Sequence, residues 1–228
     1  MTDFFLTGAE REALLLSLRV SAVAVTAALP LAFGAALLLA RTRFPGKSLL
    51  EGALYLPLVL PPVAIGFLLL SGLGTRAGAG AFLYNHFGIR FVFSWTGAAL
   101  ASGLITFPLQ LRAIKPALEA ADHGLIDAAR TLGAGSLDRL FNITIPLAAP
   151  GILSGLVTAF AASLGEFGAI ITFVSNIPGE TRTLPLAIYT ALQSPGGDLE
   201  AARLSAISIA LALILVATAN VLGSRTKR

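Results

Sequence analysis

The sequence predicts an all-α membrane protein, a polytopic bundle of five transmembrane helices. Of its 228 residues, 56% are hydrophobic and 12% are charged, which is about half the charged share of an ordinary soluble domain. A helix needs about 20 apolar residues to cross the hydrocarbon core of a bilayer. The charge-free runs of at least that length are residues 20–40, 52–73, 91–111, 140–165 and 204–223. They are apolar on every side, unlike the alternating strands of a membrane barrel.

The first span, residues 14–40, is expected to be retained in the mature protein. The region before the apolar part of a secretory signal peptide is basic, whereas Asp3, Glu10 and Glu12 outweigh Arg11 here. The apolar run is also longer than that of a signal peptide. We therefore expect a true membrane helix, within a single transmembrane domain that covers residues 1–228.

The remaining spans are expected over residues 50–73, 91–112, 147–174 and 204–223. The second contains Pro57, Pro61 and Pro62, which predict kinks, although proline is also common in membrane helices without a special role. Aromatic residues open the third span, as in the aromatic belt at a membrane surface. In the fourth, the spacing of Gly151 and Gly155 predicts a close approach by a neighbouring helix.

Positive charge is unevenly divided between the two sides of this bundle. Ten of the sixteen lysines and arginines fall on one side. They are Arg41, Arg43, Lys47, Arg112, Lys115, Arg130, Arg139, Arg225, Lys227 and Arg228. Because basic residues accumulate in cytoplasmic loops, we expect the N-terminus outside and the C-terminus inside.

The cytoplasmic segment between the third and fourth spans, residues 122–146, is expected to form two short helices. The apolar positions spaced for one face of the first helix are Leu125, Ala128, Ala129 and Leu132. Gly133 stands where a glycine commonly ends a helix. The apolar faces either pack on the inner ends of the spans or dock against another protein, and periodicity alone does not separate these alternatives.

The same segment resembles the signature of the permease subunits of bacterial ABC importers. That signature reads Glu-Ala-Ala, three residues, Gly, nine residues, Ile-x-Leu-Pro. The spacing is kept here, with Asp127 in place of Glu and Ile145 in place of Leu. In that family the segment is a coupling helix that lies in a groove on the ATPase subunit. The residues that the resemblance assigns to this contact are Asp127, Ala128, Ala129, Arg130, Gly133, Ile143 and Pro146.

Other stretches, most specifically residues 163–169 and 171–183, are similar to the permease subunits of molybdate ABC transporters. This resemblance covers nearly the whole chain. It implies a homodimeric, multi-pass protein of the bacterial inner membrane that moves molybdate or tungstate into the cytoplasm by alternating access. It also implies two ATP-binding cassette ATPase subunits and a periplasmic molybdate-binding protein as partners. Sulfate and thiosulfate permeases share the coupling motif, and transport of one of these oxyanions is the alternative.

Three residues are candidates for a gate or a pathway. Glu166 is a carboxylate in the fourth span, where charges are costly and commonly functional, and Phe167 follows it. The alternative for Glu166 is a structural hydrogen bond, to Ser163 or to a neighbouring helix, and a bare carboxylate would repel molybdate. Arg182 would favour an oxyanion near its entrance, or it is a solvated loop arginine.

The sequence favours transport over catalysis. Residues 46–48 resemble the end of a phosphate-binding loop, but Arg41 occupies the position of the required first glycine. ATP hydrolysis is therefore expected in a separate subunit. We expect no catalytic residue, cofactor or metal site, because cysteine is absent and His86 and His123 fall in different loops. We also expect no contact with nucleic acid. A membrane scaffold would leave the coupling motif unexplained.

Overall fold

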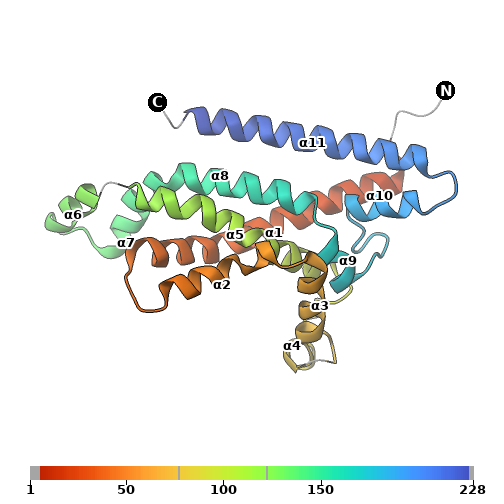
Figure 1. Ribbon diagram of the computed structural model, residues 1–228, viewed down its shortest axis with the longest axis horizontal. Coiled ribbons are helices and arrows are strands. Elements are labelled where there is room, and N and C mark those ends of the chain that lie inside the picture. Colours follow the sequence, from red (N-terminus) through yellow and green to blue (C-terminus); the bar gives the residue numbers. More distant parts are fainter. Residues whose placement is uncertain (1–5, 77, 122, 226–228) are drawn as a thin grey trace.

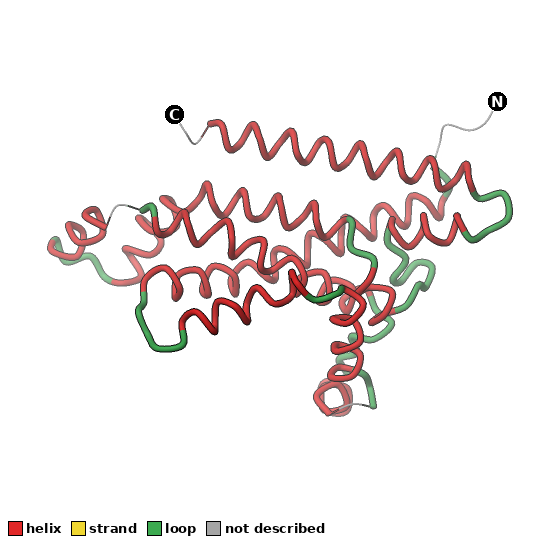
Figure 2. The backbone as a smooth tube through the Cα atoms, in the orientation of Figure 1, coloured by secondary structure: helices red, strands yellow, loops and turns green. Residues whose placement is uncertain are grey.

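The computed structural model describes residues 6–76, 78–121 and 123–225, and every regular element in these ranges is a helix (Figure 2). The expected all-α fold is thus confirmed. The helices are α1 (Gly8–Arg41), α2 (Lys47–Val59), α3 (Pro62–Leu73), α4 (Gly78–Phe87), α5 (Trp95–Glu119), α6 (His123–Thr131), α7 (Ser136–Arg139), the π-helical turn η1 (Leu140–Thr144), α8 (Ile145–Leu164), α9 (Gly168–Val174), α10 (Leu184–Leu192) and α11 (Asp198–Arg225). Figure 1 shows their arrangement.

Helix α5 forms the centre of the bundle and packs between α1 and α8. Its inward positions carry small buried residues such as Ala98, Ala101 and Gly103. A Cβ atom on Gly103 would lie 3.2 Å from the carbonyl oxygen of Ala24 on α1. Small residues at such contacts let the backbones of membrane helices come close together.

The expected close approach at Gly151 and Gly155 on α8 is confirmed. A Cβ on Gly151 would lie 2.7 Å from the carbonyl oxygen of Ala113 on α5, and one on Gly155 would lie 3.2 Å from the Cα of Gln110. Both glycines therefore face α5. A larger residue at either position would push α8 away from the centre of the bundle.

The second expected span, residues 50–73, is broken into α2 and α3, which meet at an angle of 108°. Leu60 between them is extended, and Pro61 and Pro62 begin α3. A residue before proline avoids the helical region, and proline has no N–H group to continue the hydrogen-bond ladder. The predicted kink is therefore present, but it is sharp enough to turn α3 and α4 sideways out of the bundle (Figure 1).

The fourth expected span, residues 147–174, is also interrupted, because α8 ends at Leu164 and α9 begins at Gly168. At its other end, α8 continues without a break from α7 through η1, in which the amide of Ile145 donates to the carbonyl oxygen of Leu140. The second cytoplasmic helix, which we expected to be short, is thus the beginning of a long one.

Three helices in the described ranges are long and apolar enough to cross a membrane. They are α1, α5 and the continuous helix Ser136–Leu164. The bent pair of α2 and α3 gives a fourth span if it is counted as one. The fifth span falls in α11, whose side chains are described only in part, and Lys227 and Arg228 lie outside the described residues. Five spans and the orientation of the termini therefore stay predictions.

The segments expected on the cytoplasmic side lie together at one end of the bundle (Figure 1). These are the turn between α1 and α2, the helices α6 and α7, and the C-terminal end of α11. The beginning of α1 and the turn between α10 and α11 lie at the opposite end. This arrangement agrees with the sidedness that the basic residues predict.

Candidate functional site

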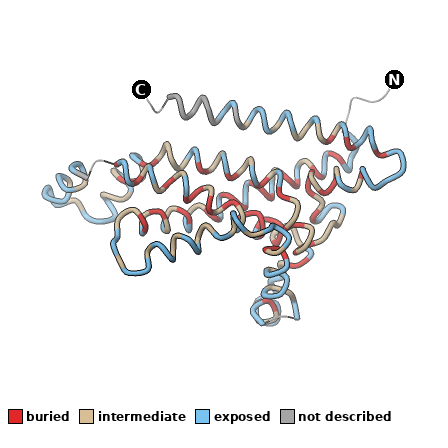
Figure 3. Tube along the Cα trace, viewed as in Figure 1, coloured by how far each residue is buried: buried red, intermediate tan, exposed pale blue. Residues whose placement is uncertain are grey.

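Helix α6, which carries the coupling signature, stands at one end of the bundle and is largely exposed (Figure 3). Leu125 on α6 and Leu132, directly after its last residue, are 51% and 88% exposed. Leu137 on α7 and Phe141 in η1 are exposed as well. In the single chain, these side chains are therefore not packed on the inner ends of the spans, which was the alternative to docking.

Gly133 ends α6 with a φ of +88°, as the sequence predicts. The amide of Ala134 donates to the carbonyl oxygen of Ala129 at 2.9 Å, and the amide of Gly133 donates to that of Arg130 at 3.1 Å. This pair of bonds is the Schellman motif. Among the described residues, no atom beyond the two chain neighbours lies within 4 Å of the place where a Cβ on Gly133 would stand. The glycine is therefore required by its backbone angle and not by lack of space.

The structure divides the signature residues into two groups. Asp127, Ala128 and Arg130 are exposed on α6, and Ala129 is half-buried there. The remaining two lie beyond the turn, with Ile143 half-buried in η1 and Pro146 exposed in the first turn of α8. Only the first group and Gly133 thus form one surface at the tip of the molecule.

Glu166 lies in the break between α8 and α9 and is 8% exposed. Its Oε1 accepts a hydrogen bond of 2.9 Å from the backbone N–H of Ala169. The carboxylate thereby satisfies one of the free N–H groups at the start of α9. Ser163 does not provide the alternative partner, because its buried hydroxyl has no hydrogen bond to any described residue.

The two helix breaks meet in space, because α3 and α9 pack against each other. A Cβ on Gly168 would lie 2.9 Å from the Cβ of Pro62. Phe167 at the same break is half-buried, and its ring lies 5.1 Å from the ring of Tyr189 on α10. The candidate gate residues Glu166 and Phe167 therefore belong to a joint that connects α3, α9 and α10.

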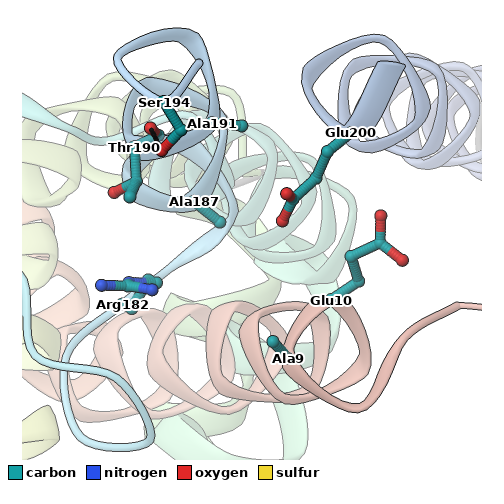
Figure 4. Close-up of a pocket in the computed structure, with 8 residues that line it drawn as sticks. All are labelled: Ala9, Glu10, Arg182, Ala187, Thr190, Ala191, Ser194 and Glu200. Atoms are coloured by element: carbon teal, nitrogen blue, oxygen red, sulfur yellow. Dashed lines mark hydrogen bonds between the residues drawn. The ribbon is translucent and has the colours of Figure 1, made fainter. Parts of the chain in front are cut away.

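Arg182 lines a cavity of about 210 Å³ between α1, α10 and α11 (Figure 4). Its Nε donates a hydrogen bond of 2.9 Å to the side-chain oxygen of Asn176. Glu10 and Glu200 lie on the opposite side of the cavity. Glu10 is paired with Arg203 on α11, and Glu200 adds a negative charge to the cavity that Arg182 lines, so the cavity offers no excess positive charge to an oxyanion. Arg182 is therefore a half-buried loop residue with a structural partner.

The arrangement of α6, the glycine turn and the long helix that follows can be compared with known families. The family described as binding-protein-dependent transport system inner membrane component matches residues 28–226. The chain belongs to this family. The matched range contains α6 and both helix breaks, so these features lie within the part of the chain that the family shares.

Individual members of the family are similar over nearly the full length. The molybdenum transport system permease protein ModB of Escherichia coli is 59% identical over 92% of this chain and 91% of its own length. ModB of Haemophilus influenzae is 51% identical over 96% of each chain. Among solved structures, a bacterial alginate ABC transporter in complex with a substrate-bound periplasmic protein has a TM-score of 0.75 at 21% identity, covering 98% of this chain and 81% of that one. The last match shows that the fold is shared.

Two buried polar residues of this inner membrane component were not predicted. Glu10 Oε1 lies 2.8 Å from the guanidinium of Arg203 on α11, and its Oε2 accepts from the amide of Thr7. Gln110 on α5 donates a hydrogen bond of 3.0 Å to the carbonyl oxygen of Val25 on α1. The spacing of Thr7 and Glu10 is that of a capping box, which signals the local role of Glu10. No local sequence pattern predicts the ion pair of Glu10 with Arg203 or the hydrogen bond from Gln110 to Val25, because each joins distant segments.

Proposed function

We propose that this chain is the membrane-spanning permease subunit of an ATP-driven importer that moves molybdate from the periplasm to the cytoplasm. The observation that carries the proposal is the 59% identity with a molybdenum transport permease over 92% of the chain. Tungstate, an oxyanion of nearly the same size and charge, is expected to use the same pathway. The alternative is sulfate or thiosulfate, which the experiment below separates from molybdate.

The exposed surface of α6 supports docking against an ATPase. Small residues at Ala128 and Ala129 suit a helix that sits in a groove, and the apolar side chains of Leu125 and Leu132 are uncovered. Burying these side chains in a partner would stabilise the complex by removing apolar surface from water. We assign Asp127, Ala128, Ala129, Arg130 and Gly133 to the contact. Ile143 in η1 and Pro146 in the first turn of α8 lie instead in the helix that follows.

The proposed assembly contains two copies of this chain, two ATPase subunits on the cytoplasmic side and a periplasmic molybdate-binding protein. The related alginate transporter structure includes a periplasmic protein, which supports the last of these partners. The chain itself is a non-catalytic subunit, and ATP hydrolysis belongs to the ATPase. It sits in the inner membrane with five spans, its N-terminus outside and its C-terminus inside.

In this proposal, closure of the ATPase dimer moves the two α6 helices together, and the long helix Ser136–Leu164 carries that motion across the membrane. The helix is continuous from α7 to Leu164, so displacement at its cytoplasmic end reaches the joint at Glu166 and Phe167. A change at this joint would open and close the pathway. Glu166 acts there as the cap of α9 and not as a ligand, because its charge would repel the oxyanion.

The test is the uptake of radioactive oxyanions by cells in which the coding sequence has been deleted. We expect molybdate uptake at trace supply to be lost, sulfate uptake to be unchanged, and both to be normal when the intact chain is restored. Unlabelled tungstate in excess should compete with molybdate. Loss of sulfate uptake with normal molybdate uptake would replace the proposal with its alternative.

A further inference from the structure

An apolar groove of about 430 Å³ lies between α1 and α5. On α1 its wall extends from Val23 to Leu31, and on α5 it extends from Thr96 to Phe107. Small residues line it, among them the buried Ala24 and Gly103 and the exposed Ala27. The residues assigned to coupling and to the gate do not line this groove.

The length of the groove matches one half of a bilayer. Eleven helical steps separate Thr96 from Phe107 on α5 and eight separate Val23 from Leu31 on α1, and at 1.5 Å per residue these walls cover about 16 Å and about 12 Å. Half of a hydrocarbon core about 30 Å thick is about 15 Å. Because the chain belongs to a family of inner membrane components and α1 and α5 are candidate spans, the groove runs along one leaflet.

A positive charge stands at the end of the groove that lies nearer the beginnings of α1 and α5. Arg19 is exposed one helical turn before Val23, and its guanidinium carbon lies 3.7 Å from the centre of the Trp95 ring. Trp95 directly precedes the groove residue Thr96. No carboxylate of the described ranges forms an ion pair with Arg19. The stacked ring holds the guanidinium in place while its N–H groups remain available.

We propose that this groove binds one acyl chain of a phospholipid, whose phosphate contacts Arg19. A phospholipid carries an apolar tail and an anionic phosphate in one molecule. The groove would hold the tail along its apolar walls, and Arg19 at its end would lie beside the phosphate. Arginine is well suited to phosphate because its planar N–H groups form paired hydrogen bonds. A helix from a second copy of the chain would fill the apolar part but would leave the guanidinium without a counter-charge.

The experiment uses the purified full-length chain in vesicles of phosphatidylethanolamine and phosphatidylglycerol that contain a trace of phosphatidylglycerol with a photoreactive acyl chain. After illumination, we expect label on residues 23–31 and 96–107. A basic residue near the membrane surface contributes about 1 kcal/mol to binding of an anionic lipid, so Arg19→Gln should reduce this label about fivefold. Arg19→Lys should retain most of it, and Arg11→Gln, a change on the same helix outside the groove, should have no effect.

A second pair of variants tests the apolar part. Ala27→Leu fills the groove and should reduce the label, whereas Ala22→Leu, at an exposed position of α1 that does not line it, should not. Label spread evenly over α1, or unchanged by both Arg19→Gln and Ala27→Leu, would overturn the proposal. Because the chain has no cysteine, Ala27→Cys provides a single thiol. A disulfide between two chains at this position would show that a second copy covers the groove, and would also overturn it.

Discussion

Gly66 on α3 lies against Ala169 on α9, so closely that a Cβ on Gly66 would stand 2.8 Å from the carbonyl oxygen of Ala169. The Cβ of Thr172, one turn further along α9, would be at the same distance. Because α3 and α9 each follow a helix break, this contact ties the two broken spans to each other. Glycine at position 66 therefore sets the distance between the two short helices.

Replacing Gly66 with alanine is expected to separate α3 from α9, because the obstructing atoms include backbone, which cannot turn aside. Overpacking of this kind costs about 1–3 kcal/mol. We expect a lower unfolding temperature for the purified chain and reduced molybdate uptake in cells. Gly72→Ala on the same helix is the matched control, since no atom of another described residue outside its own helix backbone and chain neighbours lies within 4 Å of its Cβ position. Equal effects of the two substitutions would contradict the proposed role of the contact.

Gly133→Val is expected to uncouple transport without preventing insertion. The φ of +88° strains a residue with a Cβ by about 1–2 kcal/mol, and the turn that orients α6 would shift. Co-purification of the ATPase with the tagged chain, measured together with uptake, should fall. Ala129→Asp on the face of α6 should have the same effect.

The controls for this prediction separate backbone strain from side-chain size. Asparagine tolerates positive φ, so Gly133→Asn should retain more coupling than Gly133→Val. Gly135→Ala, two residues away at a φ of −66°, should behave like the unmodified chain. A fully bound ATPase and normal uptake in both Gly133→Val and Ala129→Asp would show that α6 is not the coupling element.

Glu166 is expected to tolerate glutamine but not alanine. The amide oxygen of glutamine can accept the hydrogen bond from Ala169, whereas alanine leaves that N–H group without a partner. Loss of such a cap costs about 1 kcal/mol, so Glu166→Ala should lower both the unfolding temperature and the uptake rate. If Glu166→Gln instead abolishes uptake while the unfolding temperature is unchanged, the charge itself is needed and Glu166 is part of the gate.

Reporter fusions test the predicted topology. Fusions at Lys47 and Gly135 should be active in the cytoplasm, and those at Gly80 and Gly197 in the periplasm, because basic residues concentrate on the first side. A fusion after Arg228, which lies outside the described residues, should also be cytoplasmic. A cytoplasmic signal at Gly197 would rule out five spans with this orientation.

Features that depend on local sequence were predicted well. The glycine turn at Gly133, the close helix contact at Gly151 and Gly155, and the kink at Pro61 each follow from a residue type whose backbone or size restricts the chain. The angle of 108° was not predictable in the same way. It depends on how α3 packs against α9, and those two helices are far apart in the sequence.

Other features were missed because they arise only when distant segments meet. The charge-free run 140–165 ends at Glu166, in the break between α8 and α9, but one charged residue did not show that the expected span 147–174 is interrupted there. The position of Arg182, opposite Glu10 and Glu200, likewise depends on α1, α10 and α11 lying together. The residues next to Arg182 in the sequence do not show that these two carboxylates line the same cavity.

The exposed leucines in and directly after α6 also bear on how much of this protein a cell would retain. Uncovered apolar side chains on a cytoplasmic helix attract other chains and are recognised by chaperones and proteases when no partner shields them. A copy of this chain made in excess of the proposed ATPase would keep Leu125 and Leu132 in that state. Quality control would then remove the surplus. If α6 docks against the proposed ATPase, the supply of that subunit would then limit the abundance of the membrane subunit.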